Sequence, residues 1–134
     1  MVAVGGKPFS RRRARAQAHI EMKSETAERL ARLPKGDALT TAQLAGVMAA
    51  KRTSDLIPLC HPLSLSSIDV DVAIVENGAE ITSTVETTAQ TGVEMEALVA
   101  ASVAALTIYD MAKALDDSMV VSEIRLVEKT KEEL

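Results

Sequence analysis

The sequence is poor in aromatic residues and has one cysteine among its 134 residues. Phe9 and Tyr109 are the only phenylalanine and tyrosine, and tryptophan is absent. The core must therefore be built from aliphatic side chains and methionine, and a site that stacks nucleic-acid bases on aromatic rings is disfavoured. Because Cys60 has no second cysteine to pair with, an intrachain disulfide is excluded and a reducing compartment suits the sequence.

A basic excess, a long apolar run and a leader-like start are also missing. The formal net charge is −4 and the pI is ≈ 5.2, whereas a dedicated duplex-binding protein needs a basic surface for phosphate contacts. No apolar run reaches the ~20 residues of a membrane-spanning helix, and the N-terminus does not resemble a signal peptide. We therefore expect a cytoplasmic protein with no nucleic-acid and no membrane partner.

The first half of the chain predicts an arm, a strand and two helices. Residues 1–9 contain two glycines and a proline and are expected to form an extended arm. Apolar and polar residues alternate over 13–22, as in a half-buried strand. Two helices are expected to follow, one over 25–33 after a cap at Ser24, and one from a cap at Thr40 or Thr41 to about Arg52.

The second half predicts a hairpin, a long helix and a last strand. Pro58 and Pro62 exclude a regular helix through their stretch. Alternation over 65–75 and then 79–88, around a turn at 76–78, is typical of a β-hairpin. The remaining elements are a helix over 94–115, a strand over 119–127 and a charged tail over 128–134 that we expect to be frayed.

This order of elements predicts a single α+β domain over residues 1–134. Strand, two helices, hairpin, helix and strand follow one another as in a ferredoxin-like sandwich. In that arrangement the sheet is mainly antiparallel and the helices pack on one of its faces. The sequence contains no internal repeat.

Alanines occur on every side of the helix expected over 94–115, in place of one apolar stripe. A helix with small or apolar residues all round is buried on more than one side. We expect the second burying surface to be another subunit. Packing on the chain's own sheet alone is the alternative, since alanine also favours helices by propensity.

Charged residues break this helix only near its ends. Glu94 and Glu96 lie at its start, and Asp110 and Lys113 lie near its finish. Glu96 and Asp110 are about 21 Å apart along the axis, so one compact pocket cannot use both ends of the same helix. Either one end is structural, or the site is assembled from two chains.

Each end also has a simpler interpretation. Acids in the first turn stabilise the helix dipole, and Asp110 and Lys113 have the spacing of a surface ion pair. Against the second interpretation, the apolar neighbours of Lys113 would lower its pKa and suit it to proton transfer.

The segment KRTSDLIPLCHPL, residues 51–63, is the second candidate site. His61 lies beside Cys60 in a stretch too apolar for an exposed loop, although a histidine that only completes the core is the commoner case. One cysteine and two histidines cannot supply four zinc ligands at a known spacing, so we expect no metal. The nearby cations, which suit a polyphosphate or are solvated surface charges, are Lys51, Arg52, Arg12 and Lys35.

The stretches KRTSDLIPLCHPL (51–63) and TGVEMEALVAASVAALTIYDMAKAL (91–115) closely resemble the molybdenum cofactor biosynthesis protein C family. The KGD at 35–37 fits the same family, and the resemblance runs from Met1 to about Lys129. It implies a homohexamer, a trimer of dimers, with its sites at the dimer interface. The implied lyase reaction converts the GTP-derived nucleotide 3′,8-cyclo-7,8-dihydroguanosine 5′-triphosphate to cyclic pyranopterin monophosphate and pyrophosphate, without a metal or organic cofactor.

The resemblance also assigns residues. It implies catalytic roles for Asp110, Lys35 and Lys113, because rebuilding a purine as a pterin needs several proton transfers. Charge must also be stabilised as pyrophosphate leaves. The residues that we expect to bind the substrate are Leu59, Cys60, His61, Met95, Glu96, Glu94, Arg12 and Lys51.

Two residues depart from the family pattern. Ala3 replaces an aspartate of the usual start, and Gln90 stands where many members have a basic residue. Two other functions stay open. One is a scaffold that binds GTP-like nucleotides without releasing pyrophosphate, against which the retained Lys35 and Lys113 argue. The other is an RNA-binding domain of similar topology, which would lack the usual sheet aromatics.

Overall fold

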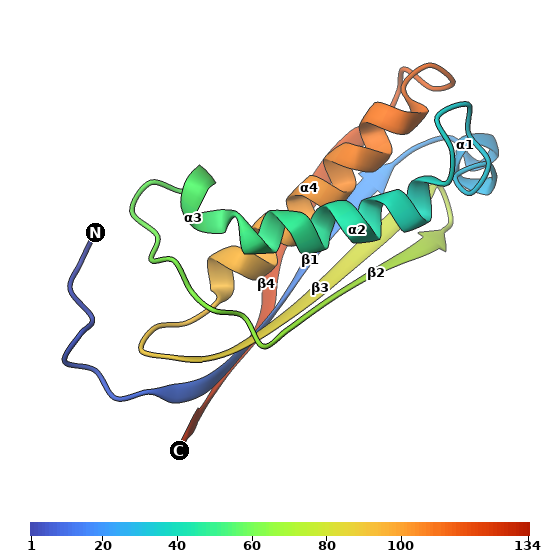
Figure 1. Cartoon of the computed structure of the whole chain (residues 1–134). Helices are drawn as coiled ribbons and strands as arrows, with labels where there is room; N and C mark the ends of the chain where they lie inside the picture. Colours follow the sequence, from blue (N-terminus) through green and yellow to red (C-terminus); the bar gives the residue numbers. More distant parts are fainter.

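A four-stranded antiparallel sheet carries two long helices on one face in the computed structural model, which describes residues 1–134 (Figure 1). The strand order is β2-β3-β1-β4. The predicted α+β, ferredoxin-like sandwich is confirmed. The elements are β1 (Ser10–Glu21), α1 (Ser24–Glu28), α2 (Ala38–Lys51), α3 (Thr53–Leu56), β2 (Ser67–Val75), β3 (Gly78–Ala89), α4 (Glu94–Ala112) and β4 (Val120–Glu133).

Alternation along the central strands gives the sheet one helix-facing side and one open side. In β1, Ala14, Ala16, Ala18 and Ile20 are buried, while the residues between them are partly exposed. The open side is polar because those intervening positions carry arginine, glutamine and histidine. The small side chains on the other side let α4 lie close to the sheet, which is where the core forms.

The alanines of α4 are explained within one chain. The sheet covers one side of this helix and α2 covers another. Gly46 of α2 is buried at the crossing, where a Cβ atom would lie 3.1 Å from the carbonyl oxygen of Ala100. The alanine pattern therefore does not require the second subunit that the sequence predicted, although Leu106 stays 57% exposed on α4.

Helix α4 also corrects the expectation that no segment is apolar enough to cross a membrane. By length and composition alone it qualifies, because its alanines and valines keep the mean hydropathy high between scattered polar residues. However, 56% of its most apolar window is buried inside the fold. Core helices of soluble proteins pass the same test, so this is weak evidence for a membrane segment.

Two predicted helix starts are wrong. Asp37 caps α2, because its Oδ1 accepts hydrogen bonds from the backbone N–H groups of Leu39 and Thr40. Ser24 is the first residue of α1 and makes no cap; its hydroxyl donates to Asn77. Helix α1 also ends at Glu28, five residues before the predicted end, and a turn closed by a Leu33–Gly36 bridge follows.

The C-terminal tail is not frayed. Strand β4 continues to Glu133, and its last residues pair with the first residues of β1, Glu133 with Ser10 and Glu132 with Arg11. An Arg11–Glu132 ion pair of 3.1 Å spans the same two strands. The sequence did not predict this part of β4 because its residues are charged and exposed, so apolar and polar residues do not alternate along it.

Asp116 fixes the connection between α4 and β4. Its Oδ2 accepts hydrogen bonds from the Lys23 N–H and the Thr26 hydroxyl, both at 2.9 Å. Its Oδ1 accepts from the N–H and hydroxyl of Ser118. Burial alone raises the pKa of Asp116, but these hydrogen bonds outweigh it and hold the pKa far below the usual range. A charged carboxylate thus joins the end of α4 to the start of α1.

We predict that Asp116→Asn destabilises the fold by about 1–3 kcal/mol near pH 7, since the amide cannot accept all of these hydrogen bonds. Because the pKa is lowered in the folded state, the wild-type advantage is complete above the unfolded pKa of about 4 and is lost as the pH falls further. Urea unfolding near pH 7 and near pH 3 measures this. Asp117→Asn, at an exposed neighbour, is the control. Equal stability of Asp116→Asn and wild type near pH 7 would contradict the account.

Candidate functional site

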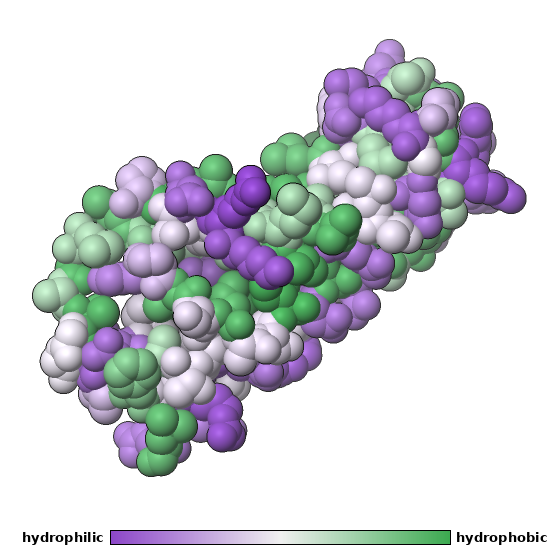
Figure 2. Space-filling view, in the orientation of Figure 1, coloured by the Kyte–Doolittle hydropathy of each residue, from purple (hydrophilic) through white to green (hydrophobic).

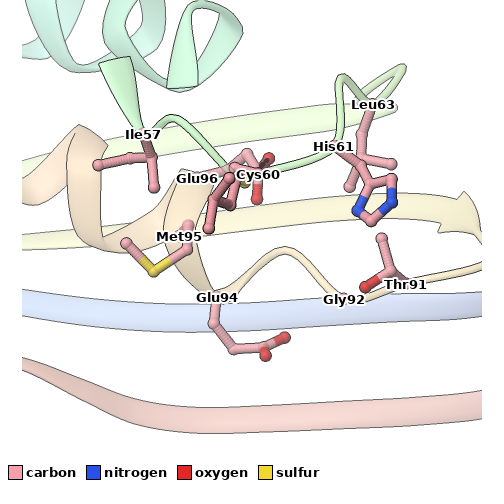
Figure 3. Close-up of a pocket in the computed structure, with 10 residues that line it drawn as sticks. Ile57, Cys60, His61, Leu63, Thr91, Gly92, Glu94, Met95 and Glu96 are labelled. Atoms are coloured by element: carbon pink, nitrogen blue, oxygen red, sulfur yellow. Dashed lines mark hydrogen bonds between the residues drawn. The ribbon is translucent and has the colours of Figure 1, made fainter. Parts of the chain in front are cut away.

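A groove of about 310 Å³ lies between residues 57–63 and the start of α4 (Figure 3). It brings together most of the residues predicted to bind substrate: Leu59, Cys60, His61, Glu94, Met95 and Glu96. The groove also includes four residues that were not predicted to bind substrate, namely Ile57, Leu63, Thr91 and Gly92. Thr91 and Gly92 are the first two residues of the motif over 91–115, so their place in the motif is the sequence signal that could have assigned them to the site.

Hydrogen bonds to β3 hold the irregular segment in place. The Thr87 hydroxyl donates to the carbonyl of Ser64 at 2.5 Å, and the Ser66 N–H donates to the carbonyl of Glu86 at 2.8 Å. The expectation that this stretch is too apolar for an exposed loop is wrong, since Leu59 is 72% exposed. His61 is partly exposed on the wall of the groove instead of completing the core.

Cys60 and Glu96 face each other inside the groove (Figure 3). The Cys60 thiol donates to Glu96 Oε2 at 3.9 Å, and Glu96 is only 3% exposed. Burial raises the pKa of the Glu96 carboxyl, and the charge of nearby Glu94 adds to this. Burial and both glutamates also raise the pKa of the Cys60 thiol. The raised pKa of the Cys60 thiol makes it a poorer source of a thiolate nucleophile than an exposed cysteine.

A second cluster forms at the other end of α4. Lys35 Nζ lies 2.9 Å from Asp110 Oδ2, and Lys113 Nζ lies 2.9 Å from Asp110 Oδ1. Hydrogen bonds from Lys35, then from Lys113, hold the pKa of the Asp110 carboxyl below its usual value. The Asp110 carboxylate is therefore charged near neutral pH and accepts a hydrogen bond from each lysine.

The apolar environment predicted for Lys113 is wrong. Its side chain is 58% exposed. The preceding residues Met111 and Ala112 point into the core, whereas Lys113 leaves the helix at its end and points outward. Apolar neighbours in the sequence did not imply apolar neighbours in space.

The KGD motif explains how Lys35 reaches α4. Gly36 has φ +121°, a conformation that other residues rarely adopt, and it closes a tight turn with Leu33. Asp37 then caps α2. This turn brings Lys35 close to Asp110, although 75 positions separate them in the chain.

The structure does not bring the two clusters together within one chain. The groove is at the start of α4, where the N-terminal arm and residues 57–66 also lie (Figure 1). The lysine–aspartate cluster is at the far end, beside α1. Glu96 and Asp110 are fourteen residues apart on a continuous helix, which is about 21 Å.

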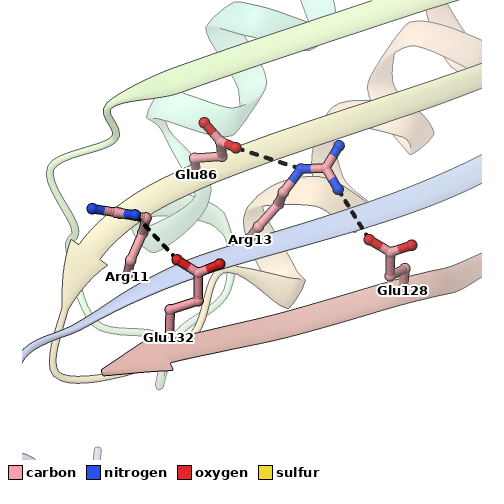
Figure 4. A network of polar contacts seen from close by, with 5 residues as sticks. All are labelled: Arg11, Arg13, Glu86, Glu128 and Glu132. Atoms are coloured by element: carbon pink, nitrogen blue, oxygen red, sulfur yellow. Dashed lines mark hydrogen bonds and ion pairs between the residues drawn. The ribbon is translucent and has the colours of Figure 1, made fainter. Parts of the chain in front are cut away.

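The arginines at the start of β1 divide between the two faces of the sheet. Arg11 and Arg13 lie on the open face and form ion pairs with Glu132, Glu86 and Glu128 (Figure 4). Arg12 lies between them on the helix-facing side, where its buried Nε has no hydrogen-bond partner. Neither Arg12 nor Lys51, which is exposed at the end of α2, lines the groove.

The molecule is therefore a ferredoxin-like α+β protein with a groove at one end of α4 and a lysine–carboxylate cluster at the other end. The chain belongs to the MoaC family, whose model matches residues 1–132. It is 58% identical over 131 residues to a cyclic pyranopterin monophosphate synthase of Novosphingobium aromaticivorans, covering 96% of this chain and 83% of the relative.

Other relatives carry the same name. The protein of Heliobacterium modesticaldum is 58% identical over 134 residues, covering 97% of this chain and 84% of the relative. That of Streptomyces coelicolor is 52% identical over 132 residues, covering 97% and 78%. The family named from the sequence motifs is confirmed.

We predict that Glu96→Gln raises the thermal midpoint by a few degrees at pH 8, because it removes a buried ionised form. Since the folded-state pKa is raised, wild type loses stability as the pH rises through that pKa, and the two proteins converge below the unfolded pKa of about 4. Calorimetry across this pH range is the measurement, with exposed Glu28→Gln as the control. A lower midpoint for Glu96→Gln at pH 8 would oppose this assignment.

Proposed function

We propose that this chain converts (8S)-3′,8-cyclo-7,8-dihydroguanosine 5′-triphosphate to cyclic pyranopterin monophosphate and pyrophosphate, an early step of molybdenum cofactor biosynthesis. The observation that carries the proposal is 58% identity over 96% of the chain to a cyclic pyranopterin monophosphate synthase. The acid–base residues implied by the family motifs, Lys35, Asp110 and Lys113, are all retained and lie in contact. The enzyme is a lyase.

The lysine–aspartate cluster supplies proton transfer in this proposal. Asp110 stays ionised and fixes the spacing of two ammonium groups, one on each of its oxygens. Lys35 and Lys113 then give and take protons while the purine ring opens and the pterin forms. Two lysines held close together by one carboxylate suit repeated proton transfer at neighbouring atoms of one substrate.

The groove binds the substrate in this proposal. Glu96 places its buried carboxyl beside Cys60, where its oxygens can accept hydrogen bonds from a purine edge. Leu59, Met95 and Glu94 line the same groove. Arg12, whose Nε has no partner, together with Lys51 and His61, is assigned to the triphosphate, where cations stabilise charge as pyrophosphate leaves.

A complete site then needs two chains. The groove of one copy meets the lysine–aspartate cluster of a second copy, as in a homohexamer built as a trimer of dimers. The apolar side chains gathered over α2 and α4 support such an assembly (Figure 2). Leu44, Met48 and Leu106 are all exposed on these helices in the single chain.

The remaining features of the proposal are simpler. The enzyme acts as one domain in the cytoplasm, with no metal or organic cofactor and no nucleic-acid or membrane partner. A scaffold that only binds the nucleotide is the second candidate. It is favoured by no specific observation, and it differs by releasing no pyrophosphate.

We predict that Lys35→Ala and Lys113→Ala each lower kcat by at least about 10²-fold, the usual contribution of a general acid or base. Pyrophosphate release from the cyclic nucleotide triphosphate is the measurement, and sedimentation shows whether the assembly is intact. Lys129→Ala, at an exposed lysine of β4, is the matched control. Full turnover in either lysine variant would remove the role given to that residue, and absence of turnover in wild type would favour the scaffold.

A further inference from the structure

Gln90 ties the N-terminal arm, residues 1–9, to the rest of the molecule. Its Nε2 donates to the carbonyl oxygens of Gly5 at 3.0 Å and Lys7 at 3.1 Å. The only other hydrogen bond of the arm is internal, from the Lys7 N–H to the Val4 carbonyl. No further hydrogen bond or ion pair joins residues 1–9 to another part of the chain. The side chain of Gln90 therefore makes all of the hydrogen bonds that join the arm to the rest of the chain.

The arm is the wall of a second cavity beside the groove. This cavity, of about 390 Å³, is lined by Val4 and Phe9 from the arm and by Gln90 at the end of β3. It shares His61, Leu63 and Thr91 with the groove. The two spaces are therefore neighbours with a shared wall, and the arm bounds the second one on the side away from the groove residues 94–96.

Gln90 is well placed to hold the arm because its own backbone is fixed. It follows Ala89, the last residue of β3, which pairs with Ser10 at the start of β1. The arm and Gln90 therefore both adjoin the same pair of hydrogen-bonded residues in the sheet, Ser10 and Ala89. Both hydrogens of the amide nitrogen are used, one for each carbonyl, so the side chain fits these two acceptors without leaving a donor free.

We propose that Gln90 is a positioning residue that fastens the N-terminal arm as one wall of the substrate site. The inference rests on the proposed function. Gln90 acts through the arm: it holds the arm in place as one side of the second cavity, and the substrate binds more tightly as a result. A lysine at this position has donors for the same carbonyls, so glutamine can replace a basic residue here without loss of the attachment.

The test uses the full-length protein with a reporter on the arm. Because the chain has no tryptophan, Val4→Trp provides a single tryptophan next to Gly5, whose fluorescence can be excited apart from that of Tyr109. Gln90→Met removes the donor while keeping length and neutrality, and Gln90→Lys restores donors. We expect Gln90→Met to lower the fluorescence anisotropy of Trp at position 4, and Gln90→Lys to restore it. Thermal midpoints show that each variant is folded.

Steady-state pyrophosphate release, measured without the reporter, gives the second readout. We expect Gln90→Met to raise KM about tenfold, as for the loss of two hydrogen bonds of modest net strength, with kcat within about twofold. Gln90→Lys should return KM toward the wild-type value. Unchanged anisotropy and KM in Gln90→Met, or equal defects in Gln90→Met and Gln90→Lys, would overturn the inference. If wild type shows no turnover, the proposed function fails, and the anisotropy alone decides whether Gln90 holds the arm.

Discussion

The length and rigidity of α4 constrain the whole functional arrangement. The helix runs unbroken for 19 residues and lies against the sheet on one side and α2 on another. At its first turn it presents Glu94, Met95 and Glu96 to the groove, and at its last turn it presents Asp110 to two lysines. A helix packed on two sides cannot bend to bring its ends together. Its first turn therefore belongs to the groove and its last turn to the separate lysine–aspartate cluster.

The packing that fixes α4 depends on small residues. Alanines face the helix from β1, and Gly46 lets α2 approach the backbone of Ala100. The Ser83 hydroxyl donates to the Ala97 carbonyl at 2.6 Å and so ties the first turns of the helix to β3. At the other end, Asp116 joins the chain after α4 to α1. Each functional cluster thus lies beside a hydrogen bond that fixes its end of the helix.

The sequence predicted the order of the elements and the fold, because alternation in β1 and β3 and the long apolar helix are strong local signals. It failed where tertiary contacts decide. The charged strand from Glu128 to Glu133 is held by pairing with β1, which no local pattern encodes. Lys113 has apolar sequence neighbours that point away from it. The hydrogen bonds of Gln90 to the arm join residues far apart in the chain and were equally inaccessible.

The sequence predicted the residues of the groove better than it predicted the cations of the site. Motif residues of 59–61 and 94–96 do converge on one groove, since a proline-rich segment and a helix start meet there. Arg12 could be separated from Arg11 and Arg13 only once the faces of β1 were known. The distance of about 21 Å between Glu96 and Asp110 follows from helix geometry alone. Because one compact pocket cannot span it, a complete site is expected to combine two subunits.

That claim is tested most directly by mixing two inactive variants. Lys35→Ala/Lys113→Ala lacks the lysines but keeps the groove, and His61→Ala/Glu96→Ala removes two groove side chains but keeps the lysines. If each site combines the groove of one chain with the lysines of another, equal mixing with subunit exchange restores about one quarter of wild-type activity. If each site lies within one chain, the mixture stays as inactive as its components, and the account is contradicted.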